Sequence, residues 1–193
     1  MVIRDLTRVF RDPLALLEER LHESAAPSVV FVTTVTPLAA IRSLAVLLPS
    51  LFGGTPMAGF VLALGSFALQ VGTWLGLALV LPALARQFRA EVTDRQAFAL
   101  ATWASSPLWL AGLFFAVPPE PAIFYWWSRL VVWFVAVYSF YIVHRGLLVL
   151  EVRRSMRMPL LGGIIVASML FYWFLFVILG IASHLVLLIV GSA

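Results

Sequence analysis

The sequence contains no cysteine and no lysine, and only 11% of its 193 residues are charged. Without cysteine the chain has no disulfide, no thiolate chemistry and no thiolate zinc or iron–sulfur site. An ordinary soluble domain is about 25% charged and about 45–50% apolar, whereas this chain is 63% hydrophobic. The composition therefore excludes a soluble globular domain and a disordered segment, and it predicts a membrane protein.

Acidic residues are absent from the cores of the apolar runs. The nine acids all lie near the ends of these runs or outside them: Asp5, Asp12, Glu18, Glu19, Glu23, Glu91, Asp94, Glu120 and Glu151. Proton-coupled transport and hydrolysis commonly use buried carboxylates. The sequence therefore argues against a proton-coupled transporter, and no nucleophile–base–acid set can be assembled for an enzyme.

The three histidines, His22, His144 and His184, fall at different expected depths, so a shared metal site is not predicted. The sequence also contains neither a phosphate-binding Walker loop nor the paired histidines of a zinc protease. We therefore expect no metal, no cofactor and no catalytic residue.

Five apolar runs are each long enough to cross a bilayer, which takes about 20 apolar residues in a helix. They are continuous rather than alternating, which predicts helices rather than strands. The runs cover residues 27–48, 57–85, 97–117, 122–143 and 160–190. The predicted fold is an all-α integral membrane protein with five transmembrane helices.

The basic residues predict the orientation of these spans. All thirteen are arginine, and eleven lie in the N-terminal segment or in the loops that follow the second and fourth runs. The connectors around LPSLFGGTP and VPPEP contain none. The positive-inside rule then places the N-terminus in the cytoplasm and the C-terminus outside. The same rule accounts for the net charge of +4, so we expect no nucleic-acid partner.

Residues 1–24 form a separate cytoplasmic segment in this interpretation. Ile3, Leu6 and Phe10 fall on one helical face, and Asp12-Pro13 is typical of an N-cap followed by a first-turn proline. The next helix places Leu14, Leu17 and Leu21 on one stripe. An amphipathic, arginine-bearing helix at this position is expected to lie on the anionic cytoplasmic leaflet. The alternative is a partly ordered tail whose arginines only set the topology.

Local signals predict where two spans bend and where one of them begins. Pro37 and Pro107 each remove a backbone donor and are expected to kink the first and third spans. The serines beside Pro107 can bond to the carbonyls that it leaves without a partner. Thr93, followed three residues later by Gln96, is a capping box, which predicts that the third span begins at Asp94.

Arg42 is the only charge well inside a span; it lies about 22 Å from Pro27 along the helix, in the outer half of the bilayer. A charge near the centre costs at least about 2.5–3.5 kcal/mol. Two interpretations remain open: Arg42 reaches the outer interface or backbone carbonyls, or it binds a lipid phosphate or another anion. Arg129, at the outer start of the fourth span, is a second candidate contact for lipid headgroups.

Glycines in the second span form a stripe of small residues. Gly72 and Gly76 have GxxxG spacing, and Gly65 lies seven residues before Gly72. Such a stripe permits close packing against another helix, either within the fold or between protomers.

Five stretches carry a family resemblance: RDPLALLEE, PLAAIRSL, LPALARQF, TDRQAFALATWASSPLWLAGLFFAVP and YSFYIVHRGLLVLEV. Together they are similar to the Ypt-interacting protein (Yip) domain family, especially its bacterial members. The resemblance runs from about Arg11 to about Ser183. It implies a five-span domain over residues 25–193 with a cytoplasmic N-terminus, in a bacterial inner membrane. It also implies a role in membrane organisation or traffic, and it brings no catalytic residues.

Two functions remain open at this stage. The first is a non-enzymatic membrane protein that acts through membrane lipids and a protein partner, either a second copy or another membrane protein. The alternative is a translocator of a small solute, an anion or a lipid. Its path would use the polar residues inside the spans: Thr33, Thr34, Thr36, Arg42, Gln70, Ser105, Ser106 and His184.

Overall fold

The computed structural model of the chain describes residues 2–23, 25–53, 55–116 and 122–191. These residues form helices and no strand. In chain order the elements are α1 (Val2–Arg11), α2 (Pro13–His22), α3 (Pro27–Val30), the π-helical turn η1 (Phe31–Val35), α4 (Thr36–Phe52), α5 (Pro56–Gln87), α6 (Asp94–Ala111), the 3-10 turn η2 (Gly112–Ala116), α7 (Ala122–Val149) and α8 (Arg154–Gly191).

Five stretches of helix are long and apolar enough to cross a membrane, which confirms the number of spans predicted from the sequence. They extend beyond the predicted apolar runs because polar and arginine-bearing turns continue the helices at their ends. The fourth span, for example, continues from Val143 to Val149, and the fifth begins at Arg154 rather than at Leu160. Val117, the predicted end of the third span, lies outside the described residues.

Helix caps confirm two predicted starts. The Asp12 side chain accepts a hydrogen bond from the backbone N–H of Ala15, with Pro13 in the first turn of α2. At α6, Thr93 and Gln96 form both bonds of a capping box, and the helix begins at Asp94. These caps satisfy backbone donors that the first turn of a helix leaves without a partner.

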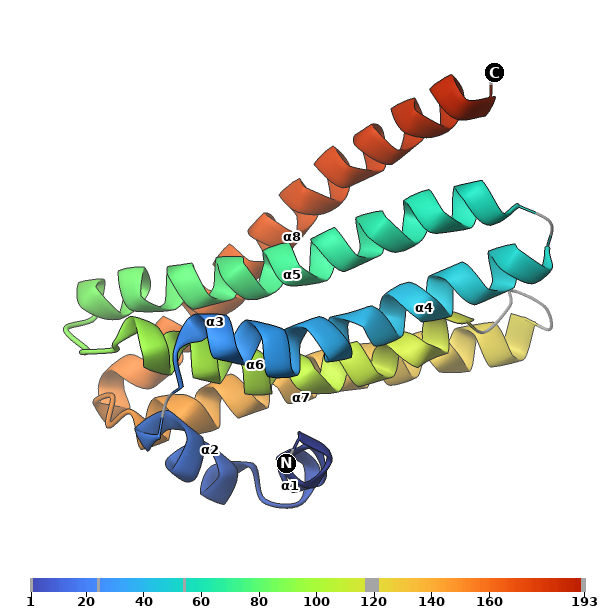
Figure 1. The fold of residues 1–193 in the computed structure, drawn as a ribbon. Helices are drawn as coiled ribbons and strands as arrows, with labels where there is room; N and C mark the ends of the chain where they lie inside the picture. The colour runs from blue at the N-terminus through green and yellow to red at the C-terminus, as the bar shows by residue number, and fades with distance from the viewer. Residues whose placement is uncertain (1, 24, 54, 117–121, 192–193) are drawn as a thin grey trace.

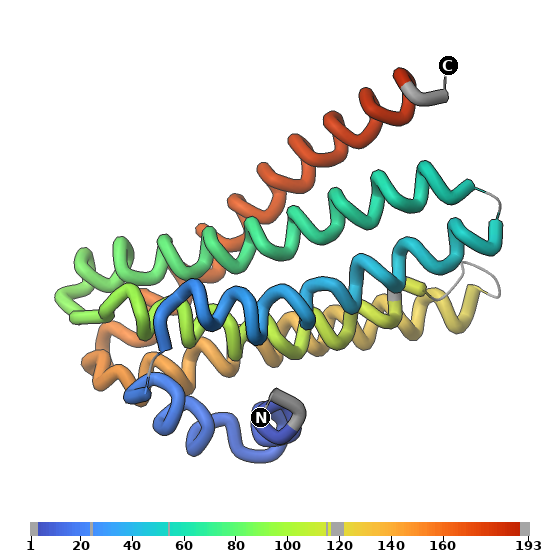
Figure 2. Tube along the Cα trace, in the orientation of Figure 1, coloured from blue at the N-terminus to red at the C-terminus, as the bar shows by residue number. Residues whose placement is uncertain are grey.

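The spans α4, α5, α6 and α7 run side by side, and α8 crosses the outside of α5 at an angle (Figure 1). α6 is the central helix: 67% of its most apolar window is buried, against 6% for α8. The tube in Figure 2 shows that the α5–α6 and α7–α8 connections lie at one end of the bundle, near α2. The α4–α5 connection and the C-terminal end of α8 lie at the other end.

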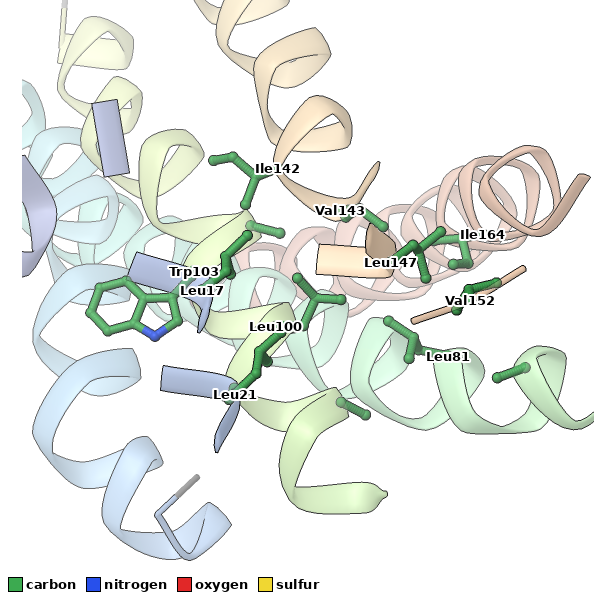
Figure 3. Close-up of a cluster of buried hydrophobic side chains, with 14 of the residues drawn as sticks. Leu17, Leu21, Leu81, Leu100, Trp103, Ile142, Val143, Leu147, Val152 and Ile164 are labelled. Carbon is green, nitrogen blue, oxygen red and sulfur yellow. The ribbon is translucent and has the colours of Figure 1, made fainter. Parts of the chain in front are cut away.

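The largest buried cluster is near the end where those two connections lie (Figure 3). It joins Leu17 and Leu21 of α2 to Leu100 of α6, Leu147 of α7 and Ile164 of α8. A second cluster surrounds Trp74 between α4, α5 and α6. Six helices contribute to the first cluster, because it also contains Val9 of α1 and Leu81 of α5. The fold therefore holds the N-terminal segment and the spans in one packed unit.

Candidate functional site

Hydroxyl groups inside the spans donate mainly to carbonyls of their own helix. Thr33 Oγ1 donates to the Val29 carbonyl at 2.7 Å, and Thr73 Oγ1 donates to the Leu69 carbonyl at 2.6 Å. The same pattern recurs at Thr36, Ser43, Thr102, Ser106, Ser128 and Ser139. A polar group in hydrocarbon is costly without a partner. These bonds therefore satisfy the hydroxyls locally instead of lining a polar path.

Pro107 lies within α6, which continues through it to Ala111. Because proline has no N–H, the carbonyl four residues earlier, on Trp103, loses its helical donor. Ser106 Oγ donates to that carbonyl at 2.9 Å, and Ser106 is fully buried. One of the two adjacent serines therefore has the role that the sequence suggested.

The helix widens into the π turn of η1 immediately before Pro37. The proline ring would otherwise press on the carbonyl of Thr33, four residues earlier. Thr36 Oγ1 donates to the Phe31 carbonyl at 3.0 Å across this wider turn. The first span therefore accommodates Pro37 through a π turn, a device known at irregular points of helices.

Two buried side chains connect neighbouring spans. Gln70 Nε2, on α5, donates to the Ala39 carbonyl of α4 at 3.0 Å. Trp74 Nε1 donates to Thr102 Oγ1 of α6 at 2.9 Å. Gln70 is 5% exposed and Trp74 is 2% exposed, so both groups fix the packing of α5 from inside the bundle.

The glycine stripe of α5 faces α8 of the same chain. A Cβ added at Gly72 would lie 2.7 Å from Leu175 Cδ1, and one at Gly76 would lie 2.3 Å from Phe171 Cδ1. At Gly65 the nearest atom would be Ser183 Oγ at 3.1 Å. The structure thus places this stripe in a contact within the fold, one of the two uses that the sequence left open.

Arg42 lies where α4 packs against Gly112, the residue that follows α6. A Cβ at Gly112 would lie 2.4 Å from Arg42 Cβ and 3.1 Å from its Cα, so the approach depends on the missing side chain of Gly112. The Arg42 side chain is half-buried. Arg129, on α7, has its guanidinium 4.5 Å from the centre of the Tyr125 ring. Both α4 and α7 contact η2, so the two arginines lie on helices that flank the same turn.

The N-terminal hairpin, defined here as α1 and α2, is joined by two ion pairs. Arg20 Nη2 donates to Asp5 Oδ2 at 2.7 Å, and Arg8 Nη1 donates to Glu19 Oε2 at 2.7 Å. Asp5 is 2% exposed, and its pairing with Arg20 compensates the cost of burying its charge. These pairs hold the two helices against each other.

The Arg8–Glu19 pair is the more exposed of the two and shifts both pKa values. The hydrogen bond from Arg8 lowers the pKa of the Glu19 carboxyl below its ordinary value, with further attraction from Arg20 and Arg4. The same bond raises the pKa of the Arg8 guanidinium. Each charge therefore favours the ionised form of its partner.

The apolar stripe of this hairpin packs on protein. Leu17 and Leu21 are each 1% exposed and belong to the main cluster with α6 and α7. Tyr138 of α7 donates from its hydroxyl to the Val9 carbonyl at 2.6 Å, and the Phe10 ring stacks on the Tyr138 ring at 5.8 Å. This differs from the expected stripe facing the leaflet: the bundle covers the α2 leucines, while Phe10 stays half exposed.

Tyr138 and the Asp5–Arg20 pair are contacts that reasoning from the sequence missed. The available signal was Asp5 itself, an acid one residue before Leu6 of the apolar face. Its partner could not be identified, because the contact depends on how two short helices fold back on each other. Tyr138 likewise gave no sign that it bonds to a residue 129 positions away.

Among the described residues, no group of three or more His, Asp and Glu side chains is arranged to hold a metal ion. A comparison of the chain with protein-family models, with curated proteins and with solved structures gives no match.

Proposed function

We propose that this chain is a non-enzymatic integral membrane protein of the bacterial Yip type, which acts in membrane organisation or traffic through lipid and protein contacts. The observation that carries the proposal is that most hydroxyls inside the spans are held by backbone carbonyls rather than left available to a substrate. Gln70 and Trp74 use their side-chain donors to connect α5 to its neighbours. The segment resemblance described above supports the same class of function.

The proposed orientation places the N-terminal hairpin and the α5–α6 and α7–α8 connections in the cytoplasm of a bacterial cell. Arginines gather in these three segments, which the positive-inside rule associates with the cytoplasmic side. The α4–α5 connection would then face the outside of the inner membrane.

Single-cysteine labelling tests this orientation cleanly, because the chain has no cysteine of its own. Thr55 and Glu91 are both exposed and lie in connections at opposite ends. In intact cells an impermeant maleimide should label Thr55→Cys and spare Glu91→Cys, whereas both should react after detergent is added. Labelling of Glu91→Cys alone in intact cells would overturn the orientation.

Three surfaces would make the proposed lipid and protein contacts. Arg42 and Arg129 flank η2 and are suited to lipid phosphates near the outer interface. The cytoplasmic face of the hairpin, with exposed Arg11 and Glu18, is suited to a protein partner or a second copy. α8 exposes a long apolar surface, as expected of a helix that meets lipid.

A translocator of a small solute, an anion or a lipid remains the alternative function. Its path would need polar groups that are available to a substrate. Thr33, Thr36 and Ser106 instead donate to backbone carbonyls, and Gln70 is buried between α4 and α5. These bonds favour the organising role over transport.

Photo-crosslinking in native membranes tests the protein-contact part of the proposal. A photo-reactive residue at Arg11 should give adducts with one defined protein, either this chain or another, identified by mass spectrometry. The control position is Leu170, which is exposed on α8 and should give mainly lipid adducts. Absence of any protein adduct from Arg11, Glu18 and further hairpin positions would contradict the organising role.

A further inference from the structure

α5 and α7 end in the same way. At α5 the N–H of Ala90 donates to the Ala85 carbonyl at 2.9 Å, and the N–H of Arg89 donates to the Arg86 carbonyl at 3.1 Å. At α7 the equivalent bonds run from Val152 to Leu147 at 3.2 Å and from Glu151 to Leu148 at 3.0 Å. Both ends are Schellman motifs, in which one residue adopts the left-handed conformation.

The left-handed residue in each motif is charged. Arg89 and Glu151 both have φ of 54°, in the region that glycine adopts without steric cost. Glycine is the residue usually found there. The chain instead holds a long charged side chain at both positions, in the backbone conformation that disfavours it. Strain of this kind gathers at ligand-binding sites.

The two caps border one cavity that is open to the surface, and its four charged lining residues are all exposed. It has a volume of about 320 Å³ and is lined by Arg89, Glu91, Glu151 and Arg153, together with Ala90, Leu150 and Val152. This volume lies near the lower end of small-molecule sites, which span about 300–1,000 Å³. In the described part of the chain, no hydrogen bond or ion pair engages any of the four charged side chains. Two cations and two anions thus line one small space, and none of them forms an ion pair with another.

We propose that this cavity binds a phosphoethanolamine group, with its phosphate on Arg89 and Arg153 and its ammonium on Glu91 and Glu151. Guanidinium groups bind phosphate oxygens through charge-assisted hydrogen bonds. A primary ammonium has three N–H donors for the two carboxylates. The inference rests on the membrane-spanning part of the proposed function and is independent of the organising role.

The charge arrangement discriminates among common headgroups. A choline headgroup has the same two charges, but its quaternary ammonium has no N–H to donate to Glu91 or Glu151. A glycerol headgroup has no cation and leaves both carboxylates facing an anionic ligand. The cavity therefore favours phosphoethanolamine over both, and the group can come from a phosphatidylethanolamine in the leaflet or from a soluble ester.

Native mass spectrometry of the full chain tests the proposal. The protein is exchanged into equal amounts of phosphatidylethanolamine, phosphatidylcholine and phosphatidylglycerol of matched acyl chains. The wild type should retain phosphatidylethanolamine preferentially, and Glu151→Gln and Arg153→Gln should each weaken that retention about tenfold, since each removes a charged hydrogen-bonding group. Arg95→Gln is the matched control, because it removes a charge from an exposed residue at the same end that does not line the cavity.

Soluble glycerophosphoethanolamine distinguishes the two sources. If it displaces the lipid at equal concentration, the site takes the soluble group; if it does not, the site takes the lipid headgroup. Equal retention of the three lipids by the wild type, or an unchanged preference in folded Glu151→Gln and Arg153→Gln, would overturn the inference. Either result would leave the crosslinks expected from Arg11 unchanged. Failure of the phosphoethanolamine proposal can therefore be told apart from failure of the proposed organising role.

Discussion

The hydroxyl of Tyr138 in the fourth span donates a 2.6 Å hydrogen bond to the backbone carbonyl of Val9 in the first helix. Val9 is 1% exposed, so the bond lies at the buried contact between the N-terminal hairpin and the bundle. Together with the leucines of α2, it makes this hairpin part of the fold. Any function of the hairpin at the membrane surface is therefore linked to the packing of α7.

Removing that hydroxyl should loosen the hairpin without unfolding the spans. Tyr138→Phe leaves the Val9 carbonyl without this donor and should cost about 1–3 kcal/mol of local stability. Hydrogen exchange in α1 should accelerate, and trypsin should cut faster after Arg11. Tyr141→Phe is the control, since Tyr141 bonds to Arg145 rather than to the hairpin. Equal exchange in wild type and Tyr138→Phe would show that the bond does not hold α1.

Acid should weaken the hairpin through Glu19. Because Arg8 lowers the pKa of Glu19 in the folded state, the pair stabilises the hairpin fully above the unfolded pKa of about 4.3. The stabilisation is lost as the pH falls through the lower folded pKa. Exchange in α1 and α2, corrected for intrinsic rates, should rise as the pH falls below about 4.3. Glu19→Gln should reduce that rise, and a Glu19→Gln profile identical to the wild type would refute the assignment.

The contact between α5 and α8 depends on Gly76. An alanine methyl there would meet the Phe171 ring at 2.3 Å, and overpacking of this kind costs about 1–3 kcal/mol. Thermal unfolding in detergent should begin at a lower temperature in Gly76→Ala. Gly162→Ala on α8 is the matched control, because nothing lies within 4 Å of its added methyl. If both variants unfold alike, α8 does not pack on α5 as described.

Glycine should stabilise the two helix caps that border the charged cavity. Arg89→Gly and Glu151→Gly relieve a left-handed conformation that costs a residue with a side chain about 1–2 kcal/mol. Each variant should unfold at a higher temperature while losing preferential binding of phosphatidylethanolamine. Arg86→Gly is the control and should unfold at a lower temperature than the wild type, because glycine in the last turn of α5 costs about 1 kcal/mol. A lower unfolding temperature for Arg89→Gly would show that contacts of the Arg89 side chain stabilise the fold by more than its left-handed backbone costs.

Reasoning from the sequence could locate the five spans and two helix starts, because these depend on local signals. Apolar runs report span length, and the Asp12 and Thr93 caps act within one turn. The glycine stripe also indicated a close contact, but a pattern on α5 cannot tell which helix covers it. The burial of Leu17 and Leu21 was missed for the same reason: periodicity defines an apolar face but not what packs on it.

The left-handed conformation of Arg89 and Glu151 at the ends of α5 and α7 could not be predicted from residue propensities. A left-handed residue at a helix end is normally expected to be glycine, and neither Arg89 nor Glu151 gives a local signal for that conformation. Their proximity depends on α5 and α7 ending at the same side of the bundle. The cavity is thus a property of the tertiary structure, and its four charged residues appeared in the sequence only as loop charges.

Reconstitution into liposomes tests the central claim most directly. Wild type and Arg42→Leu would be inserted into vesicles, verified to contain folded protein, and assayed for lipid scrambling and anion flux. The organising role predicts rates equal to those of protein-free vesicles for both proteins. Scrambling or flux that rises with the amount of wild-type protein and is lost in folded Arg42→Leu would contradict it and identify the chain as a translocator.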